Sequence, residues 1–236
     1  MNVAVRPRWG LPHLVLSGLT AAVVAASPFG VLQNLQKVAQ LRFDPATVQT
    51  TDVAPPLTPA APPFVIKGDT ADARQAVKCL AQAVYFEAGF QPIEGQRAIA
   101  QVILNRVRDR NFPDTVCGVV YEGWKRRTGC QFSFVCDGSL WRRPPTGDEI
   151  ASAEKIALDA LNGYVVAAVG TATHYHTWKI DPYWNDSLVK TAQIGDHIFY
   201  RWPGKAGRVE ALHDDRYDGG EVSVAHRSPK EAVLLG

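Results

Sequence analysis

Apolar residues recur at helical spacing in two consecutive stretches, residues 71–88 and 92–109. The apolar positions in each are three or four residues apart, so they form one stripe on a helix surface. The stripes consist of Val77, Leu80, Ala81, Val84 and Ala88, and of Ile99, Val102, Ile103 and Val107. Gly89, in the left-handed conformation, is expected to end the first helix, and Pro92 to open the second. The pattern therefore predicts two helices joined by a short turn.

A third helix is predicted at residues 149–162, with Asp148 as its cap and Gly163 as its stop signal. The segment between the second and third helices is irregular. Residues 171–178 and 197–202 are rich in β-branched and aromatic side chains, which favours short extended pieces. The expected class is α+β, mainly helical, with a small sheet or loop wall.

The flanking regions have their own patterns. Arg6 and Arg8 precede an apolar run at residues 11–26, which is typical of an export signal with a possible cut after Ala26, or of an uncleaved membrane anchor. A Pro- and Ala-rich stretch follows and favours an extended linker. The expected organisation is a signal peptide or N-terminal membrane anchor at 1–30, a linker at 31–71, a domain at 72–203 and a polar tail at 204–236.

Composition narrows the class of protein. The chain of 236 residues is 46% hydrophobic and 20% charged, as expected for a globular domain. A formal net charge of +2, with mostly scattered basic residues, argues against a nucleic-acid partner. Four cysteines in an exported chain favour two disulfides over a zinc site, because there is no CxxC pair and the spacings are irregular. The pairing that we favour is Cys117 with Cys130 and Cys79 with Cys136.

Glu87 is the main candidate for chemistry. It lies in the last turn of the first predicted helix, about 20° from Leu80 on the helix surface, at the edge of the apolar stripe. The helix dipole and partial burial both disfavour a charged carboxylate there and raise its pKa, as a general acid requires. The bland alternative is that Glu87 extends into water or pairs with Arg106. Glu94 opens the second helix, where charge is stabilised, and is expected to be an ordinary helix-start residue.

Further candidates surround these helices. Gln96 projects toward the apolar stripe, where its amide could hold Glu87 or a sugar. His174 and His176 lie on one side of a predicted strand, with Tyr175 opposite, but no third ligand is near in sequence, so no metal is expected. The side chains suited to contacts with sugar rings are Tyr85, Tyr121, Gln131, Phe132, Phe134, Tyr175 and Trp178. Phe132 and Phe134 are more readily explained as core residues.

Several blocks of sequence, in order, resemble the cell wall hydrolase family of the spore-cortex-lytic type. They are "CLAQAVYFEAGFQPIEGQRAIAQVILNRV", "FPDTVCGVVYEG", "CQFSFVCDG", "ATHYHT" and "QIGDHIFYR", which together span residues 79–201. The resemblance implies a lysozyme-like fold that cleaves the glycan strand of peptidoglycan. It also implies a lytic transglycosylase with Glu87 as general acid. The family usually reads "EARGEP" where this chain has "EAGFQP", so Gly89, Phe90 and Gln91 depart from the pattern.

The expected reaction needs only one carboxyl group. Glu87 would protonate the bond between N-acetylmuramic acid and N-acetylglucosamine, and the sugar's own 6-hydroxyl would close a 1,6-anhydro ring. Tyr175, His176 and Gln131 are expected to position the substrate, with Gln96 and Tyr121 as further contacts and no cofactor. Three alternatives remain open: a muramidase using Asp137 or Glu94 as second carboxylate, a non-cutting peptidoglycan-binding module, and a metal-dependent amidase using His174 and His176. The expected partner is peptidoglycan in the cell envelope, with membrane anchoring through residues 1–30 as one form of the N-terminus.

Overall fold

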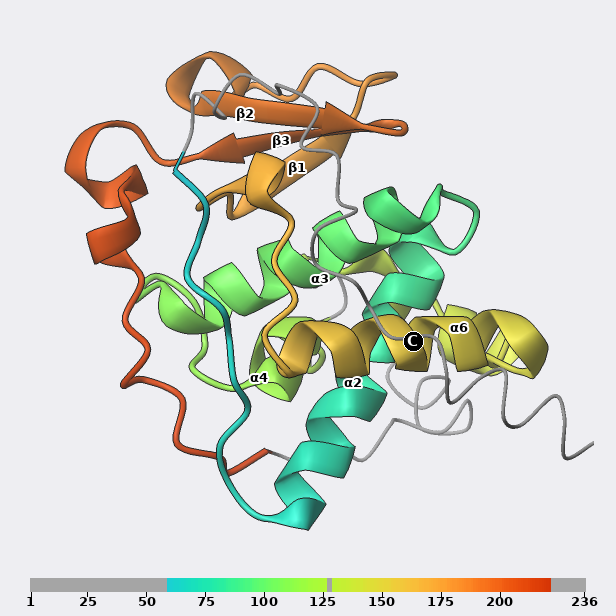
Figure 1. Cartoon of the computed structure of the whole chain (residues 1–236). Helices are drawn as coiled ribbons and strands as arrows, with labels where there is room; N and C mark the ends of the chain where they lie inside the picture. Colours follow the sequence, from blue (N-terminus) through green and yellow to red (C-terminus); the bar gives the residue numbers. More distant parts are fainter. Residues whose placement is uncertain (1–58, 127–128, 222–236) are drawn as a thin grey trace, which may run out of the picture. The chain divides into compact units, whose positions relative to one another are not determined.

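The computed structural model describes residues 59–126 and 129–221. The three longest helices of this part are α2 (Thr70–Ala88), α3 (Ile93–Arg108) and α6 (Gly147–Leu161). A small sheet lies above α3 in Figure 1. The short helices are α4 (Val116–Val120) and α5 (Ser139–Arg142), and 3-10 turns lie at Ser133–Val135, Ala167–Val169, Asn185–Ser187, Gly204–Gly207 and Val209–Ala211. The expected class, α+β and mainly helical with a small sheet, is confirmed.

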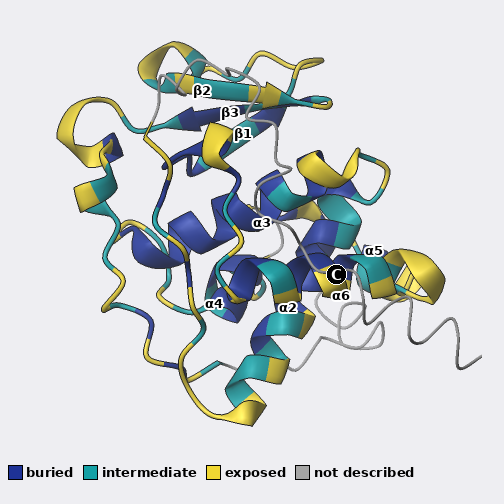
Figure 2. Cartoon of the chain, in the orientation of Figure 1, coloured by how far each residue is buried: buried dark blue, intermediate teal, exposed yellow. Residues whose placement is uncertain are grey.

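Helix α3 forms the centre of the core. It packs against α2, α4, α6 and the sheet strand β2 (Val189–Ile194), and Figure 2 shows it buried along most of its length. Its apolar stripe, including Ile99 and Ile103, is fully buried. Polar Asn105 is buried too, and its Nδ2 donates hydrogen bonds to the carbonyl oxygens of Gly170 (2.9 Å) and Ala172 (2.8 Å). The helix thereby holds the segment that leads into the sheet.

The sheet has three antiparallel strands in the order β1–β3–β2, with β1 at His174–Thr177 and β3 at His197–Arg201. Tyr175 of β1 pairs with Phe199 of β3. The two extended pieces expected near residues 171–178 and 197–202 are confirmed as β1 and β3. Strand β2 was not predicted, because it has no aromatic residue and its β-branched residues, Val189, Thr191 and Ile194, are separated by polar and small ones.

The packed unit is wider than the range 72–203 expected from sequence. Phe64, before α2, and Tyr217, near the end of the described chain, are both buried and lie edge-to-face with ring centroids 5.3 Å apart. Buried Arg108 joins the two segments, because its Nη1 donates to the carbonyl oxygen of Pro62 (2.8 Å) and to Asp214 (3.1 Å). Parts of the expected linker and tail therefore belong to the core, since they supply aromatic side chains that can be buried.

The ends of the predicted helices differ from expectation in two details. Gly89 has φ −55° and ψ −27°, so it continues the right-handed conformation instead of adopting the expected left-handed one. The N-cap of α6 is Thr146, and Asp148 lies in the first turn.

No helix in the described part of the chain combines the length and the apolar composition that a membrane crossing needs. The predicted signal peptide or anchor, residues 1–30, lies outside the described residues.

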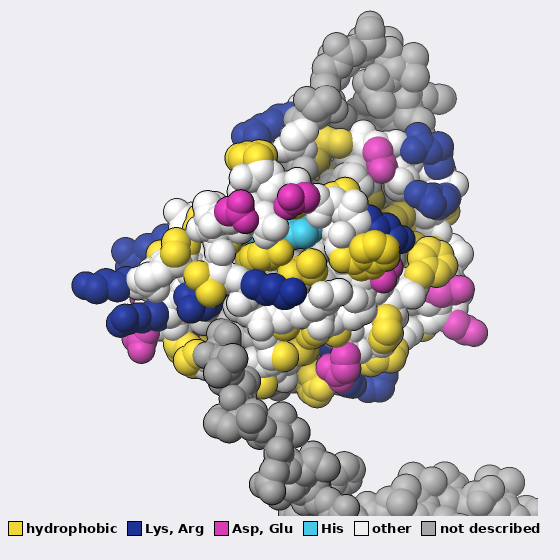
Figure 3. Space-filling view, turned by 90° about the horizontal axis from the view of Figure 1, so that it is seen from above, with side chains coloured by type: hydrophobic (Ala, Val, Ile, Leu, Met, Phe, Trp, Pro, Cys, Tyr) yellow, Lys and Arg dark blue, Asp and Glu magenta, His cyan; other side chains and the backbone are white. Residues whose placement is uncertain are grey.

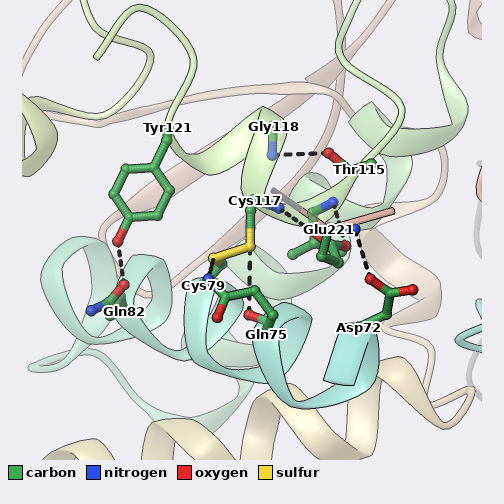
Figure 4. Close-up of a disulfide and its surroundings, with 10 residues drawn as sticks. Asp72, Gln75, Cys79, Gln82, Thr115, Cys117, Gly118, Tyr121 and Glu221 are labelled. Atoms are coloured by element: carbon green, nitrogen blue, oxygen red, sulfur yellow. Dashed lines mark hydrogen bonds between the residues drawn. A yellow bond between two sulfur atoms is a disulfide. The ribbon is translucent and has the colours of Figure 1, made fainter. Parts of the chain in front are cut away.

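The disulfide pairing expected from sequence is wrong. The bonds are Cys79–Cys117, with Cα atoms 5.3 Å apart, and Cys130–Cys136. Figure 4 shows the first bond joining α2 to the first turn of α4. These helices pack directly against each other, which sequence spacing does not reveal, while Cys130 and Cys136 are both in the irregular segment before α5.

Candidate active site

Glu87 lies in the last turn of α2, and its side chain is partly buried. Val84 and Leu80, about one and two turns earlier, are fully buried and fix the orientation of this helix face. The turn that follows is closed by hydrogen bonds from Gly89 N to Tyr85 O (3.1 Å) and from Gln91 N to Ala88 O (2.8 Å). The carboxyl group is therefore presented from a rigid helix end.

The hydroxyl of Tyr175 donates a hydrogen bond of 3.0 Å to Oε2 of Glu87. Tyr175 reaches this position because the carbonyl oxygens just before β1 are bonded to α3. Asn105 binds Gly170 and Ala172, and Arg106 Nε donates to the carbonyl oxygen of Thr173 (2.7 Å). These bonds from α3 thus fix the position of β1 relative to the end of α2.

Arg106 is a buried residue whose positive charge acts on Glu87. Its guanidinium lies 5.2 Å from the ring centroid of Phe112, 5.6 Å from that of Phe132 and 6.0 Å from that of Tyr175. Only 4% of the residue is exposed, and its Nη1 has no hydrogen-bond partner. In the described part of the chain Glu87 forms no ion pair with Arg106, so the bland alternative is not what the structure shows. The ring of Tyr175 lies over the guanidinium, and its hydroxyl holds the carboxyl.

The electrostatics of Glu87 favour a retained proton. Desolvation raises the pKa of the Glu87 carboxyl above its ordinary value, and the nearby Asp137 carboxylate adds to that effect. The hydrogen bond from Tyr175 and the positive charge of Arg106 lower the pKa, but they do not offset the burial. Burial also lowers the pKa of Arg106 and raises that of Tyr175 well above its ordinary range. A proton held on a helix-end carboxyl, beside a neutral tyrosine, can be donated to a bound substrate.

The other residues predicted to contact substrate, Gln96, Gln131 and Tyr121, have different surroundings in the structure. Gln96 donates from Nε2 to the carbonyl oxygen of Gln91 (3.0 Å), so its amide supports the turn after Glu87. Gln131 precedes buried Phe132, whose ring lies over Arg106. The hydroxyl of Tyr121 donates to the side chain of Gln82 on α2, beside the Cys79–Cys117 disulfide (Figure 4).

His176 lies on the side of β1 opposite Tyr175, as strand alternation predicts, and its expected contact with substrate stays a prediction. Neighbouring strand residues face opposite sides of a sheet, so His176 faces away from the side of Tyr175 that meets Glu87. Its Nε2 lies 2.9 Å from Tyr200 Oη and its Nδ1 lies 2.9 Å from the carbonyl oxygen of Thr177. Because a carbonyl only accepts, Nδ1 carries the proton and Nε2 accepts from Tyr200. This places His176 in a structural network of the sheet.

The two other candidate carboxylates, Glu94 and Asp137, lie in different environments. Glu94 forms an ion pair with Arg97 (2.8 Å) on an exposed surface, as expected for a helix-start charge. Asp137 accepts a hydrogen bond from Ser139 N (2.7 Å); burial works against its charge, but Ser139, Arg142 and Arg143 bring its pKa below the ordinary value. Asp137 is therefore an ionised carboxylate within electrostatic reach of Glu87. Among the described residues, no group of three or more His, Cys, Asp or Glu side chains is arranged to hold a metal ion.

Phe132 and Phe134 are both buried, so their expected core role is confirmed. Sequence reasoning named Arg106 only as an ion-pair partner of Glu87 and missed its contact with the Tyr175 ring. It also missed Asp196, at the turn between β2 and β3, which contacts Gln91 and Trp178. A Gly-Asp pair between two strands indicates only a turn, so nothing in the sequence pointed to that contact.

Comparison with known proteins gives a consistent result. A sequence profile described as Cell Wall Hydrolase matches residues 90–200, which include the sheet and begin just after Glu87. The spore cortex-lytic enzyme of Oceanobacillus iheyensis is 39% identical over 126 residues, covering 52% of this chain and 40% of that protein. The spore cortex-lytic enzyme of Bacillus subtilis is 36% identical over 124 residues, covering 52% of this chain and 36% of that protein. The chain thus spans about two fifths of the length of these curated relatives.

A solved structure adds a similarity over a whole domain. The catalytic domain of the germination-specific lytic transglycosylase SleB from Bacillus anthracis is 32% identical, with 57% of this chain and 100% of that chain covered, at a TM-score of 0.46. A carboxyl with a raised pKa, hydrogen-bonded by a tyrosine at a helix end, is suited to acid–base chemistry. The chain belongs to the cell wall hydrolase family.

Proposed function

We propose that this protein cleaves the glycan strand of peptidoglycan as a lytic transglycosylase, at the bond between N-acetylmuramic acid and N-acetylglucosamine. The observation that carries the proposal is the Glu87 carboxyl, whose pKa is raised by burial and which is held by Tyr175. Family membership and the names of the relatives, spore cortex-lytic enzyme and lytic transglycosylase, support this substrate and chemistry. The resemblance to this family also supports a lysozyme-like arrangement of the domain.

The proposed reaction has two steps. Glu87 donates its proton to the glycosidic oxygen as the bond from that oxygen to C1 of N-acetylmuramic acid breaks, which leaves an oxocarbenium-like centre at C1. The 6-hydroxyl of the same sugar then attacks C1, and its proton passes to the Glu87 carboxylate. The products are a 1,6-anhydro sugar end and a free 4-hydroxyl on N-acetylglucosamine, and Glu87 regains its starting protonation state.

Tyr175 and Arg106 have distinct proposed roles in this reaction. Tyr175 occupies Oε2 of Glu87, which directs the transferable proton to the other carboxyl oxygen. Arg106 lies under the Tyr175 ring and stabilises the carboxylate that exists between the two steps. Both effects lower the cost of the charged intermediate without requiring an ion pair, which would hold the carboxyl permanently ionised.

A second candidate function is muramidase-type hydrolysis. It is favoured by Asp137, an ionised carboxylate whose charge acts on Glu87. A hydrolase typically uses a second carboxylate, either to activate water or as the nucleophile. The two reactions differ in their products, since hydrolysis leaves a reducing sugar end and transglycosylation leaves an anhydro end.

We propose that the protein reaches peptidoglycan outside the cytoplasm, in the periplasm or otherwise associated with the cell envelope. The apolar run at residues 11–26 would act as a cleaved export signal or as a membrane anchor, and the Pro- and Ala-rich stretch after it as a spacer. Two disulfides agree with an oxidising compartment.

The test is digestion of purified peptidoglycan with the wild type and with Glu87→Gln, followed by mass spectrometry of the product ends. We expect anhydro ends from the wild type and a rate loss of about 10²–10⁴-fold in the variant, the usual contribution of a general acid. Glu94→Gln is the matched control, because it makes the same change on an exposed residue of the next helix. Full activity of Glu87→Gln would refute the assignment, and reducing ends alone would establish the muramidase. Wild type that binds peptidoglycan without cutting it would establish a binding module instead.

A further inference from the structure

Gln91 joins the turn after α2 to the tip of the β2–β3 hairpin. Its Oε1 accepts a hydrogen bond from Asp196 N (2.9 Å), and its Nε2 donates to Asp196 Oδ2 (3.3 Å). The two residues are 105 positions apart in the chain. The two bonds use both ends of the amide, so the contact requires a side chain that donates and accepts at once. We call the pair Gln91 and Asp196 the clasp.

The clasp continues to Trp178, just after β1. The other oxygen of the Asp196 carboxylate, Oδ1, accepts from the indole Nε1 of Trp178 (3.2 Å), and Trp178 N donates to the carbonyl oxygen of Asp196 (2.9 Å). The orientation of the indole is therefore fixed at its polar edge. The residue nevertheless remains 57% exposed, so the face of its ring is open to a ligand. Lys179 lies beside it, with Nζ 5.6 Å from a Trp178 ring centroid.

This arrangement is connected to the site at both ends. Gln91 lies four residues after Glu87 in a hydrogen-bonded turn, and Trp178 lies three residues after Tyr175, about 10 Å along an extended chain. The end of the unit that carries the sheet, seen from above in Figure 3, exposes hydrophobic side chains among acidic and basic ones. A fixed, exposed indole three residues after the tyrosine that bonds Glu87 presents an apolar ring surface with a polar edge, as sites for sugar rings do.

We propose that Gln91 and Asp196 are positioning residues whose clasp holds Trp178 as a binding platform for a sugar ring of the glycan strand, beside the bond on which Glu87 acts. The inference rests on the proposed function for the identity of the strand. Trp178 touches the substrate, and Gln91 and Asp196 act through it.

Gln91→Glu tests the clasp with a change that preserves shape. The introduced carboxylate can still accept from Asp196 N, but it cannot donate to Asp196 Oδ2, so like-charge repulsion between the two carboxylates replaces that second bond. We expect KM for peptidoglycan to rise about tenfold, the effect of losing one hydrogen bond to a charged group, with kcat changed less than about twofold. Gln193→Glu is the matched control, because it makes the same change on an exposed residue of strand β2 in the same hairpin.

Acidification provides a rescue that a purely structural defect would not show. Lowering the pH protonates the introduced carboxyl, which can then donate to Asp196, so the KM of Gln91→Glu should return toward that of the wild type. The other titratable groups with a charge effect on Asp196 are Lys179 and His197, and both are unchanged in variant and control. An equal KM for Gln91→Glu and Gln193→Glu at every pH would overturn the proposal.

Binding measured without catalysis separates this inference from the proposed function. In the Glu87→Gln background, co-sedimentation with purified peptidoglycan sacculi should weaken with Trp178→Ala and with Gln91→Glu, but not with Gln193→Glu. Trp178→Phe keeps an aromatic ring but loses the hydrogen bond to Asp196, so its binding should be weaker than that of the background protein and stronger than that of Trp178→Ala. Indifference of binding to Trp178 and Gln91 would overturn the platform alone. Wild type that leaves peptidoglycan uncut, with binding that still depends on Trp178, would overturn the proposed function alone, and no binding by the background protein would overturn both.

Discussion

The hydroxyl of Tyr175 lies 3.0 Å from Oε2 of Glu87, although the two residues are 88 positions apart in the chain. One comes from the end of α2 and the other from β1, and α3 holds the approach to β1 through Asn105 and Arg106. The bond opposes the effect of burial on the Glu87 carboxyl. The balance between these two influences leads to direct predictions.

Tyr175→Phe should shift the pH dependence of activity. The hydrogen bond from Tyr175 stabilises the carboxylate and lowers the pKa of Glu87, so its removal leaves burial less opposed and raises that pKa further. A general acid works while protonated, so the alkaline limb of the kcat/KM profile should move to higher pH as the maximum rate falls. Turbidity loss of peptidoglycan across a pH series measures both. An unchanged profile would contradict the role assigned to Tyr175.

Glu87→Gln should stabilise the folded protein at neutral pH. A carboxyl with a raised folded pKa keeps its proton to higher pH than in the unfolded chain, so the stability cost of ionisation is absent below about pH 4.5 and grows as the pH rises through the raised pKa. The amide cannot ionise and avoids that cost. We expect Tm to rise by about 3 °C at pH 7, roughly the effect of 1 kcal/mol in a unit of this size, and to change little at pH 4.

Scanning calorimetry at the two pH values checks this prediction. Glu94→Gln serves as the control, because its exposed ion pair with Arg97 contributes less than about 1 kcal/mol. A lower Tm for Glu87→Gln at pH 7 would show that the carboxylate is stabilised by the fold rather than strained by it.

Asp137→Asn separates the two candidate reactions. If the sugar's own 6-hydroxyl completes the reaction, the variant should retain most activity, with the alkaline limb moved to lower pH because a charge that raises the Glu87 pKa is gone. If Asp137 activates water, the rate should fall about 10²–10⁴-fold. Product analysis by mass spectrometry should show anhydro ends in both wild type and variant. Loss of nearly all activity together with reducing-end products from the wild type would favour the muramidase.

The two disulfides should contribute unequally to stability. Cys79–Cys117 closes a loop with a sequence separation of 38 and joins α2 to α4, so Cys79→Ala with Cys117→Ala should cost about 3–4 kcal/mol. Cys130–Cys136 spans a separation of only 6, and its removal should cost about 2 kcal/mol or less. Urea unfolding of both double variants gives the comparison. Peptide mapping of the unreduced protein checks the pairing, and a Cys117–Cys130 peptide would contradict it.

Glu221 should stabilise the turn that begins α4. Its two carboxyl oxygens accept from Val116 N (2.9 Å) and Cys117 N (2.8 Å), and Asp72 holds the backbone of Gly220 and Glu221 in turn (Figure 4). Glu221→Ala leaves two amide groups without acceptors and should cost about 1–3 kcal/mol in urea unfolding. A cost near zero would show that water replaces the carboxylate and that this contact is dispensable.

The sequence by itself was sufficient for the elements whose signal is local. The apolar stripes of α2 and α3 lie within one helix each, so periodicity predicted both helices and placed Glu87 at a helix end next to an apolar face. The same local reasoning separated Glu87 from Glu94, because the position of each residue on its helix sets which side of the apolar stripe it occupies.

Only the tertiary structure decided how distant segments meet. The pairing of Cys79 with Cys117 depends on α4 packing against α2, and the clasp between Gln91 and Asp196 depends on the height of the β2–β3 hairpin above the end of α2. Strand alternation by itself placed His176 opposite Tyr175, but only the packing of β1 against β3 decided that His176 bonds Tyr200. Such contacts arise from the packing of whole elements, and a spacing along one chain does not encode which faces will touch.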